Sequence, residues 1–435
     1  MINLFFVTHD FSGVKTYTNE LLGYLSEQPD IVVHRIFIES RDYKEYTETK
    51  EANILNIYIP LWEQQKRISF EKYASRCMDL LDHVVRNKKH IIFHLNNAIH
   101  VNLGIEARKR FGAKMIYTLH FLPNYFTYLN IDGSRMENLH PFDNLLENKV
   151  IHEVDQIICV TQFAQEMAIH FFNCPIEKTI AIHNGYGEKS KVISISEKQR
   201  KTIRNDFGFN EADQIILFVG RLEKRKGLKH LIDAFLQICQ RYSELRLVIA
   251  GDGNFEEMLR FIKGKWGQIT FTGKISSQEL LKLYTIAKIG VIPSIYEQCS
   301  YVALEMMHYG MPIVVSGSPG LNELFLDNEN ALIVPVYEHR GGLLESEIHE
   351  KELVEKLEII LNDNELRQKL GKNARMRWEQ NYTVKNMGKA TVKQYKKLIT
   401  ENQINYSLEG RRAESWTLTD LILSAPTPSP KKERS

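Results

Sequence analysis

Short apolar segments rich in β-branched residues alternate with amphipathic segments along this chain, and the alternation occurs twice, before and after a polar stretch at residues 186–196. This alternation predicts parallel sheets covered by helices on both faces. We therefore expect an α/β protein made of two Rossmann-like, doubly wound parallel-sheet domains. The expected strands are residues 2–7, 31–38, 91–95, 114–119 and 156–160, then 215–219, 246–250, 269–272, 289–292 and 313–315. The expected helices include residues 17–25, 73–85, 101–111, 228–241, 255–263, 278–287 and 301–309.

The length of the chain also requires more than one core, because 435 residues far exceed the roughly 150 residues of an ordinary domain. We place the first domain at residues 1–190, the second at 191–381 and a helix that returns to the first domain at 382–400. The tail at 401–435 ends in a Pro-rich, charged segment that cannot bury apolar surface, and we expect it to be largely disordered. Open α/β sheets bind ligands at the carboxyl ends of their strands, so two such domains predict a site in the cleft between them.

Charge and cysteine content exclude several classes of protein. The 56 Lys and Arg residues nearly balance the 54 Asp and Glu residues, so no basic field for nucleic acid is expected. Five cysteines without a C-x-x-C pair predict neither a disulfide framework nor a zinc site. The apolar start at residues 2–7 is too short for a signal peptide, and no run could span a membrane. We expect a cytoplasmic protein, with peripheral contact at the inner face of a membrane left open. The sequence does not give the oligomeric state.

The first chemical motif covers residues 218–228, where a strand ends in Gly220 and a second glycine opens a helix after a basic turn. Gly220 would allow backbone to approach a ligand, while Arg221 and Lys226 could neutralise a diphosphate. The alternative interpretation is an ordinary basic surface turn.

The second motif covers residues 293–312, in which Glu297 and Glu305 are separated by seven residues. If a helix begins near Ser300, its first amides are free donors for phosphate or sugar oxygens. These are the amides of Cys299, Ser300 and Tyr301. Glu305 could accept two hydrogen bonds from a ribose diol, or it could be a solvated helix residue. Apolar neighbours favour the first interpretation, because a carboxylate among them needs a partner.

Further motifs follow in a fixed order: His183-Asn184-Gly185, then residues 250–253, 271–273 and 318–323. With the two motifs above, they make the chain closely resemble the large retaining glycosyltransferase family four, which has the GT-B fold. The motifs cover most of residues 180–325. The resemblance implies that Arg221 and Lys226 bind the diphosphate of a nucleoside-diphosphate sugar and stabilise its developing charge. It further implies that Glu305 holds the ribose, and that Glu297 holds the transferred sugar beside the backbone of residues 299–301. Gly253 is expected beside the same substrate.

The first domain matches the family more loosely. The family usually has a Gly-Gly pair after the first strand, whereas this chain has only Gly13. Gly13 still permits close approach of a phosphate or an acceptor. His120, at the end of the strand expected at 114–119, matches the active-site histidine of the family. His94 is a second candidate for acceptor contacts. Either histidine could instead be an ordinary core residue.

The resemblance implies retention of anomeric configuration, a front-face reaction and no catalytic metal or other cofactor. The donor sugar and an acceptor hydroxyl are the expected partners. The acidic pairs at 327–329 and 363–365 are interpreted as solvated caps. The basic cluster at 108–110 is interpreted as a solvated helix face, with a membrane-surface role as the alternative. A GT-B sugar-nucleotide epimerase and a non-catalytic nucleotide-sugar-binding homologue are the rival functions.

Overall fold

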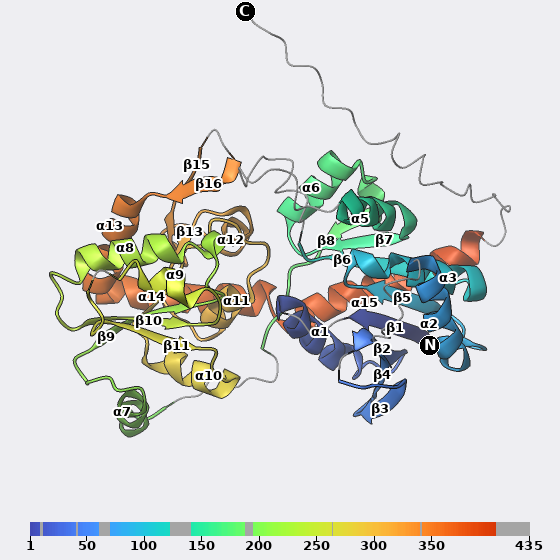
Figure 1. Cartoon of the computed structure of the whole chain (residues 1–435), viewed down its shortest axis with the longest axis horizontal. Coiled ribbons are helices and arrows are strands. Elements are labelled where there is room, and N and C mark those ends of the chain that lie inside the picture. Colours follow the sequence, from blue (N-terminus) through green and yellow to red (C-terminus); the bar gives the residue numbers. More distant parts are fainter. Residues whose placement is uncertain are drawn as a thin grey trace, which may run out of the picture.

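The computed structural model describes residues 1–8, 12–40, 42–60, 70–121, 141–187, 195–262, 264–339 and 342–405. Figure 1 shows two α/β lobes side by side, each built around its own sheet. The predicted fold class is confirmed. Most of the predicted linker lies outside the described residues. The predicted tail also lies outside them from residue 406 onward.

The first domain is built on an eight-stranded sheet with the order β3-β4-β2-β1-β5-β6-β7-β8, in which every pair except β3–β4 is parallel. Its strands are β1 (Ile2–Thr8), β2 (Ile31–Ser40), β3 (Thr47–Glu51), β4 (Ile54–Pro60), β5 (Ile91–Leu95), β6 (Lys114–Leu119), β7 (Gln156–Cys159) and β8 (Thr179–Ala181). Its helices are α1 (Ser12–Leu25), α2 (Phe70–Val85), α3 (Val101–Phe111), α5 (Pro141–Glu153) and α6 (Gln162–Phe172). Side chains from α2, α3, α5 and α6 cover one face of the sheet.

The second domain has a parallel six-stranded sheet with the order β11-β10-β9-β12-β13-β14. Its strands are β9 (Gln214–Val219), β10 (Leu245–Ala250), β11 (Ile269–Gly273), β12 (Ile289–Ile292), β13 (Ile313–Ser316) and β14 (Leu332–Val334), and a separate hairpin consists of β15 (Val336–His339) and β16 (Gly342–Ile348). Its helices are α7 (Glu197–Asp206), α8 (Leu228–Ile238), α9 (Phe255–Leu259), α10 (Ser277–Ile286), α11 (Tyr301–His308), α12 (Pro319–Leu324), α13 (Glu350–Asn362) and α14 (Asn364–Asn381). The strand order reverses between β9 and β12, and in the first sheet between β1 and β5. These are the switch points at which doubly wound sheets hold ligands.

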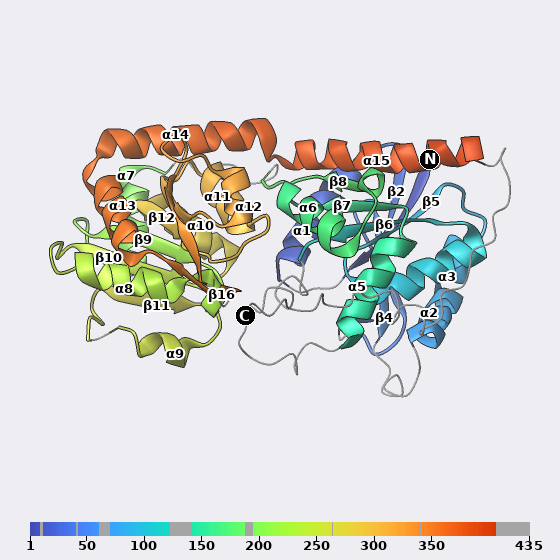
Figure 2. The ribbon, with the colours of Figure 1, turned by 90° about the horizontal axis from the view of Figure 1, so that it is seen from above.

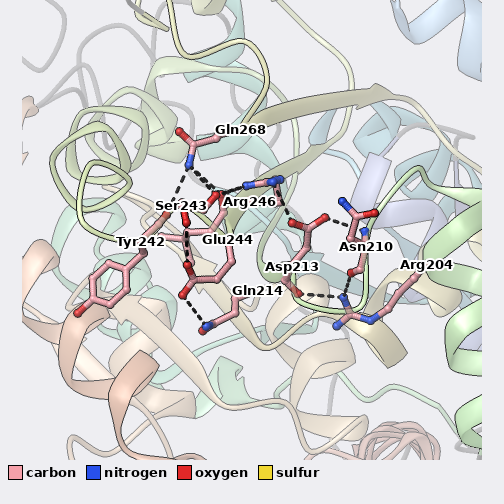
Figure 3. Close-up of polar contacts among 10 residues, drawn as sticks. Arg204, Asn210, Asp213, Gln214, Tyr242, Ser243, Glu244, Arg246 and Gln268 are labelled. Carbon is pink, nitrogen blue, oxygen red and sulfur yellow. Dashed lines mark hydrogen bonds and ion pairs between the residues drawn. The ribbon is translucent and has the colours of Figure 1, made fainter.

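A polar network closes the opposite, amino-terminal edge of the second sheet (Figure 3). Asp213, just before β9, forms an ion pair with Arg246 of β10 (2.9 Å) and accepts a hydrogen bond from the Asn210 amide (2.8 Å). Arg204 donates to the carbonyl oxygens of Asn210 (3.1 Å) and Asp213 (2.9 Å). Polar side chains therefore link the segments at the amino-terminal edge of this sheet. A binding site is expected at the opposite, carboxyl-terminal edge.

The chain crosses between the domains twice, and the two crossings lie next to each other. The Tyr186 amide donates to the Tyr382 carbonyl oxygen (3.1 Å), and Tyr186 and Thr383 form a parallel bridge. After the second crossing, α15 (Val384–Asn405) lies along the first domain, in line with α14 on the second (Figure 2). Its apolar side chains complete a core with α1 and β1. The two connections between the domains therefore run side by side at Tyr186 and Thr383.

A carboxylate of the second domain also joins the two domains directly. Glu323 of α12 accepts hydrogen bonds from the backbone amides of Gln162 and Phe163 (both 2.8 Å), the first residues of α6, and from His183 Nε2 (2.6 Å). Amides at a helix start lack intrahelical partners and carry partial positive charge, so they suit a carboxylate. Burial raises the pKa of Glu323, but the hydrogen bonds from His183 and the two amides outweigh burial and leave the pKa below its usual value. Glu323 is therefore held ionised.

Replacing this carboxylate tests its contribution to stability. Glu323→Gln should lower the free energy of unfolding at pH 7 by about 2 kcal/mol, because an amide gives up charge-assisted hydrogen bonds. Since the folded-state pKa is lowered, the carboxylate stabilises the protein above the unfolded pKa of 4.5, and this stability is lost as the pH falls through the folded pKa. Urea unfolding should therefore show the difference between wild type and variant shrinking as the pH falls below 4.5. Glu329→Gln, which changes an exposed carboxylate nearby, is the matched control. Equal effects of the two substitutions would contradict the assignment.

Candidate functional site

A cavity of about 850 Å³ lies between the two domains, at the carboxyl-terminal edges of both sheets. The first turn of α1 and the segment after β6 contribute to one wall, and the segments after β9, β10 and β12 contribute to the other. The predicted site residues that line it are Gly13, His120, Gly220, Arg221, Lys226, Glu297, Cys299, Ser300 and Tyr301. The predicted interdomain cleft is therefore present, and residues far apart in the sequence meet in it.

The two loops that carry the charged residues of the second domain are packed directly against each other. The Ile295 amide donates to the Arg225 carbonyl oxygen (2.8 Å). Gly227 has φ +65°, and a Cβ at this position would overlap the Pro293 carbonyl oxygen. Across this contact Lys226 Nζ forms an ion pair with Glu297 Oε1, and both side chains are largely buried. Lys226 and Glu297 thus form one unit on the cavity wall.

A second set of charges borders this unit. Glu223 pairs with Arg221 Nη1 and with Arg225 Nε (both 2.7 Å). Arg225 also lines the cavity, and its guanidinium lies over the ring of Phe121 from the first domain, 5.2 Å from the ring centroid. The sequence interpretation missed Arg225 and Phe121. The run of basic residues at 224–226 was a usable signal for Arg225, whereas nothing local pointed to its aromatic partner.

Helix α11 begins at the cavity, as predicted. Ser300 is its N-cap and accepts a hydrogen bond from the Ala303 amide (3.4 Å). The loop before it is held by the first domain, because Asn184 Nδ2 donates to the Cys299 carbonyl oxygen (3.0 Å) and Thr161 Oγ1 donates to Gln298 Oε1 (2.8 Å). Contacts with the first domain therefore fix the loop before α11, and with it the first turn of the helix, whose amides lack intrahelical partners.

His120 occupies the wall formed by the first domain. Its Nε2 lies 3.0 Å from Asn96 Oδ1, and its ring packs edge-on against Tyr17 at 4.6 Å between centroids. Gly13 borders the same wall, and a Cβ there would meet no protein atom within 4 Å. Packing among the described residues therefore does not require a glycine at this position.

Three predicted site residues lie outside the cavity lining, and two of them, His94 and Gly253, have other contacts that replace the expected ones. His94 lies within β5 and is fully buried, with Nδ1 2.6 Å from Tyr395 Oη and Nε2 2.6 Å from Thr118 Oγ1. Burial lowers its pKa to about 3. Gly253 packs against Leu222, where a Cβ would lie 2.8 Å from the Leu222 nitrogen. His94 is a core histidine, and Gly253 serves packing between loops.

Glu305 also lies outside the cavity lining, one turn beyond Tyr301 on the same face of α11. The sequence predicted that this carboxylate needs a partner, and in the structure the Tyr284 hydroxyl donates to Glu305 Oε2 (2.7 Å). Burial raises the pKa of Glu305 to about 7, although the hydrogen bond from Tyr284 acts in the opposite direction. The carboxylate is therefore poised to change its charge near neutral pH.

The acidic segments at 327–329 and 363–365 and the basic cluster at 108–110 all form contacts within the protein. Asp363 caps α14 through the Leu366 amide (2.9 Å), and Asp327 accepts a hydrogen bond from the Ile333 amide (2.8 Å). In the basic cluster, Arg108 pairs with Asp155 (3.1 Å) and Arg110 with Asp79 (2.5 Å). Among the described residues, no group of three or more His, Cys, Asp or Glu side chains could hold a metal ion. Within the same residues, no helix is long and apolar enough to cross a membrane.

Sequence comparisons identify two families along the chain. The model "Glycosyltransferase Family 4" matches residues 11–188, and the model "Glycosyl transferases group 1" matches residues 199–377. An uncharacterised glycosyltransferase of Methanocaldococcus jannaschii is 31% identical over 261 residues, which are 58% of this chain and 64% of that relative. The alpha-monoglucosyldiacylglycerol synthase of Streptococcus pneumoniae is 23% identical over 365 residues, with 81% of this chain and 80% of that relative covered.

Solved structures share the same architecture. The sucrose-phosphate synthase of Thermosynechococcus elongatus superposes with a TM-score of 0.70 at 19% identity, covering 92% of this chain and 100% of that one. Anabaena HepE, in complex with UDP and glucose, gives a TM-score of 0.70 at 15% identity, covering 91% and 100%. At these identities the likeness shows the fold.

The contact between the two charged loops can be tested through Gly227. Gly227→Ala should lower the free energy of unfolding by about 3 kcal/mol or more, because the left-handed backbone strain is joined by overlap with Pro293. Gly208→Ala is the matched control, since Gly208 has φ +76° but open space around it, and only about 1 kcal/mol of backbone strain applies. Urea unfolding followed by circular dichroism measures both. Equal losses would show that the close approach to Pro293 contributes nothing.

Proposed function

Because the chain belongs to the GT-B glycosyltransferases of the group 1 and family 4 type, we propose that it transfers a sugar from a nucleoside diphosphate to an acceptor hydroxyl with retention. The single observation that carries this proposal is the convergence of Arg221, Lys226, Glu297 and the start of α11 on one interdomain cavity. Cations suit the diphosphate, and carboxylate and amides suit sugar hydroxyls. HepE, with the same fold, binds UDP and glucose.

On the donor side, Lys226 and Arg221 would bind the diphosphate and stabilise the negative charge that develops on it as the glycosidic bond breaks. Arg225, which lines the same wall, would add a third cation. The ion pair with Glu297 holds the Lys226 ammonium at the wall before a donor enters. Glu297 would then accept hydrogen bonds from the transferred sugar. The reaction proposed here uses no metal or other cofactor.

Glu305 would hold the ribose of the donor. As a carboxylate it accepts two hydrogen bonds from a diol, whereas the protonated form accepts fewer. Its position one turn below Tyr301, on the face of α11 that reaches the cavity, supports this role.

On the acceptor side, His120 and Gly13 border the space where a hydroxyl would approach the anomeric carbon. We propose a front-face reaction, in which the leaving phosphate takes the proton of the attacking hydroxyl while the donor sugar keeps its configuration. The proposed compartment is the cytoplasm, because all five cysteines are buried, free thiols.

Calorimetric titration with UDP, GDP and ADP tests the nucleotide site, and binding of at least one is expected. A donor screen by nucleotide release should then show release that depends on an added acceptor, for which an alkyl glucoside and diacylglycerol in mixed micelles are suitable probes. Binding of none of the nucleotides would contradict the proposal. Epimer formation from the donor without any acceptor would instead identify a sugar-nucleotide epimerase.

Lys226 offers a sharper test of the chemical step. Lys226→Ala should reduce turnover by about 10²-fold, the typical loss when one group that stabilises transition-state charge is removed. Lys229→Ala is the matched control, because Lys229 lies outside the cavity lining and pairs with Asp233 at 2.7 Å. Steady-state kinetics of nucleotide release should show this loss for Lys226→Ala alone. Unchanged turnover would remove Lys226 from the mechanism.

A further inference from the structure

We propose that Asn96 is a positioning residue that holds His120 in the Nε2–H tautomer, so that Nδ1 is the ring nitrogen able to accept a hydrogen bond from a substrate. The tautomer follows from the hydrogen bonds around Asn96. The use of Nδ1 toward a substrate rests on the proposed function.

Asn96 and His120 lie on neighbouring strands at the switch point of the first sheet. Asn96 directly follows β5, and His120 directly follows β6, the parallel partner of β5. On its other side β5 pairs with β1, the strand that precedes α1 along the chain, and Gly13 lies in the first turn of α1. Asn96 is therefore buried between β1 and the histidine, at only 4% exposure.

The orientation of the Asn96 amide follows from its two contacts. Nδ2 donates to the Val7 carbonyl oxygen of β1 (3.0 Å). A backbone carbonyl only accepts hydrogen bonds, so the NH₂ group must face Val7 and Oδ1 must face His120. Oδ1 lies 3.0 Å from His120 Nε2, and because an amide oxygen also only accepts, Nε2 carries the proton. In the neutral ring the lone pair then resides on Nδ1.

The neutral character of Asn96 suits this role. A carboxylate at the same place would favour the imidazolium form, in which neither nitrogen can accept a hydrogen bond. An amide fixes the proton on Nε2 without adding a charge. The buried neighbour His94 adds none either, because burial lowers its pKa to about 3.

A second contact restricts the ring plane. Tyr17 packs edge-on against His120, and its hydroxyl lies 3.1 Å from Thr118 Oγ1, which in turn lies 2.6 Å from His94 Nε2. Tyr17 belongs to α1, whose first turn carries Gly13 at the cavity. Asn96 thus sets which nitrogen is protonated, and Tyr17 restricts how the ring lies.

The tautomer can be measured without an activity assay. In the full chain with ¹⁵N-labelled histidine rings, long-range ¹H–¹⁵N spectra distinguish a protonated ring nitrogen from a pyridine-type one, and the His120→Gln spectrum identifies the His120 signals by difference. At pH 8 the wild type should show a protonated Nε2 and a pyridine-type Nδ1. Asn96→Ala should show a mixture of both tautomers, whereas Asn96→Asp keeps an acceptor facing Nε2 and should keep its proton there.

Thr118→Val is the control for general damage to the core, because it removes the hydrogen bonds to His94 and Tyr17 and leaves the Asn96 contacts in place. Its His120 signals should match the wild type. A protonated Nδ1 in the wild type, or an unchanged Nε2–H tautomer in folded Asn96→Ala, would overturn the proposal.

Kinetics separate this inference from the proposed function. Asn96→Ala should lower the turnover of sugar transfer by about 10-fold, the lower end of the loss found when the hydrogen-bond partner of a metal-ligating histidine is removed, while the affinity for UDP or GDP stays within about twofold of wild type. If the tautomer is as stated but no transfer is found, the proposed function fails and the assignment of Asn96 stands. If transfer occurs with full turnover in Asn96→Ala, the positioning role fails.

Discussion

The cavity depends on one carboxylate that crosses from the second domain to the first. Glu323 occupies the amide-rich start of α6 and is further held by His183, so it joins the second domain to a fixed point beside β7. Thr161, the N-cap of α6, bonds to Gln298 in the loop that carries Glu297 and Cys299. The start of one helix in the first domain therefore positions two segments of the second. The relative placement of the two cavity walls therefore depends on charge and hydrogen bonds, together with apolar contacts such as those of Tyr296 with Phe121 and Phe163.

The two walls are built by different physical means. In the second domain, backbone packs on backbone: Gly227 lies against Pro293, Gly251 against Gly220, and Gly320 against Gln298, each with no room for a Cβ. Such contacts leave the charged side chains little freedom. In the first domain, contacts between side chains shape the cavity wall, because Asn96 and Tyr17 hold the ring of His120. The wall of the second domain is set largely by contacts between main-chain segments, and the wall of the first domain largely by contacts between side chains.

Much of this arrangement could be predicted from the sequence, because the strands of the two switch points are short apolar runs and the residues after them carry the chemistry. A helix start near Ser300 and the position of His120 at a strand end followed from local pattern, whereas the expectation that Lys226 and Glu297 share one site followed from the family resemblance. The edge strand β3 and its neighbour β4 were missed, and β3 consists of alternating Thr and charged residues without an apolar run. His94 was misjudged for a physical reason: it lies inside β5, and Tyr395 of α15, from the far end of the described chain, covers it. Arg225 and Phe121 meet across the cavity, so neither segment predicts the contact by itself.

Helix α15 is translated after the whole second domain, yet it completes a core of the first domain. Tyr395 and Leu398 of α15 share a core with Leu4 and Phe6 of β1, and Gly388 lets the helix approach Tyr24 of α1 closely. The ribosome therefore releases the first domain without the cover for this face and completes the sheet of the second domain before α15 emerges. Domains usually finish folding in the order of their synthesis. Here the first domain cannot complete this core until α15 has been synthesised, which happens after the whole sheet of the second domain.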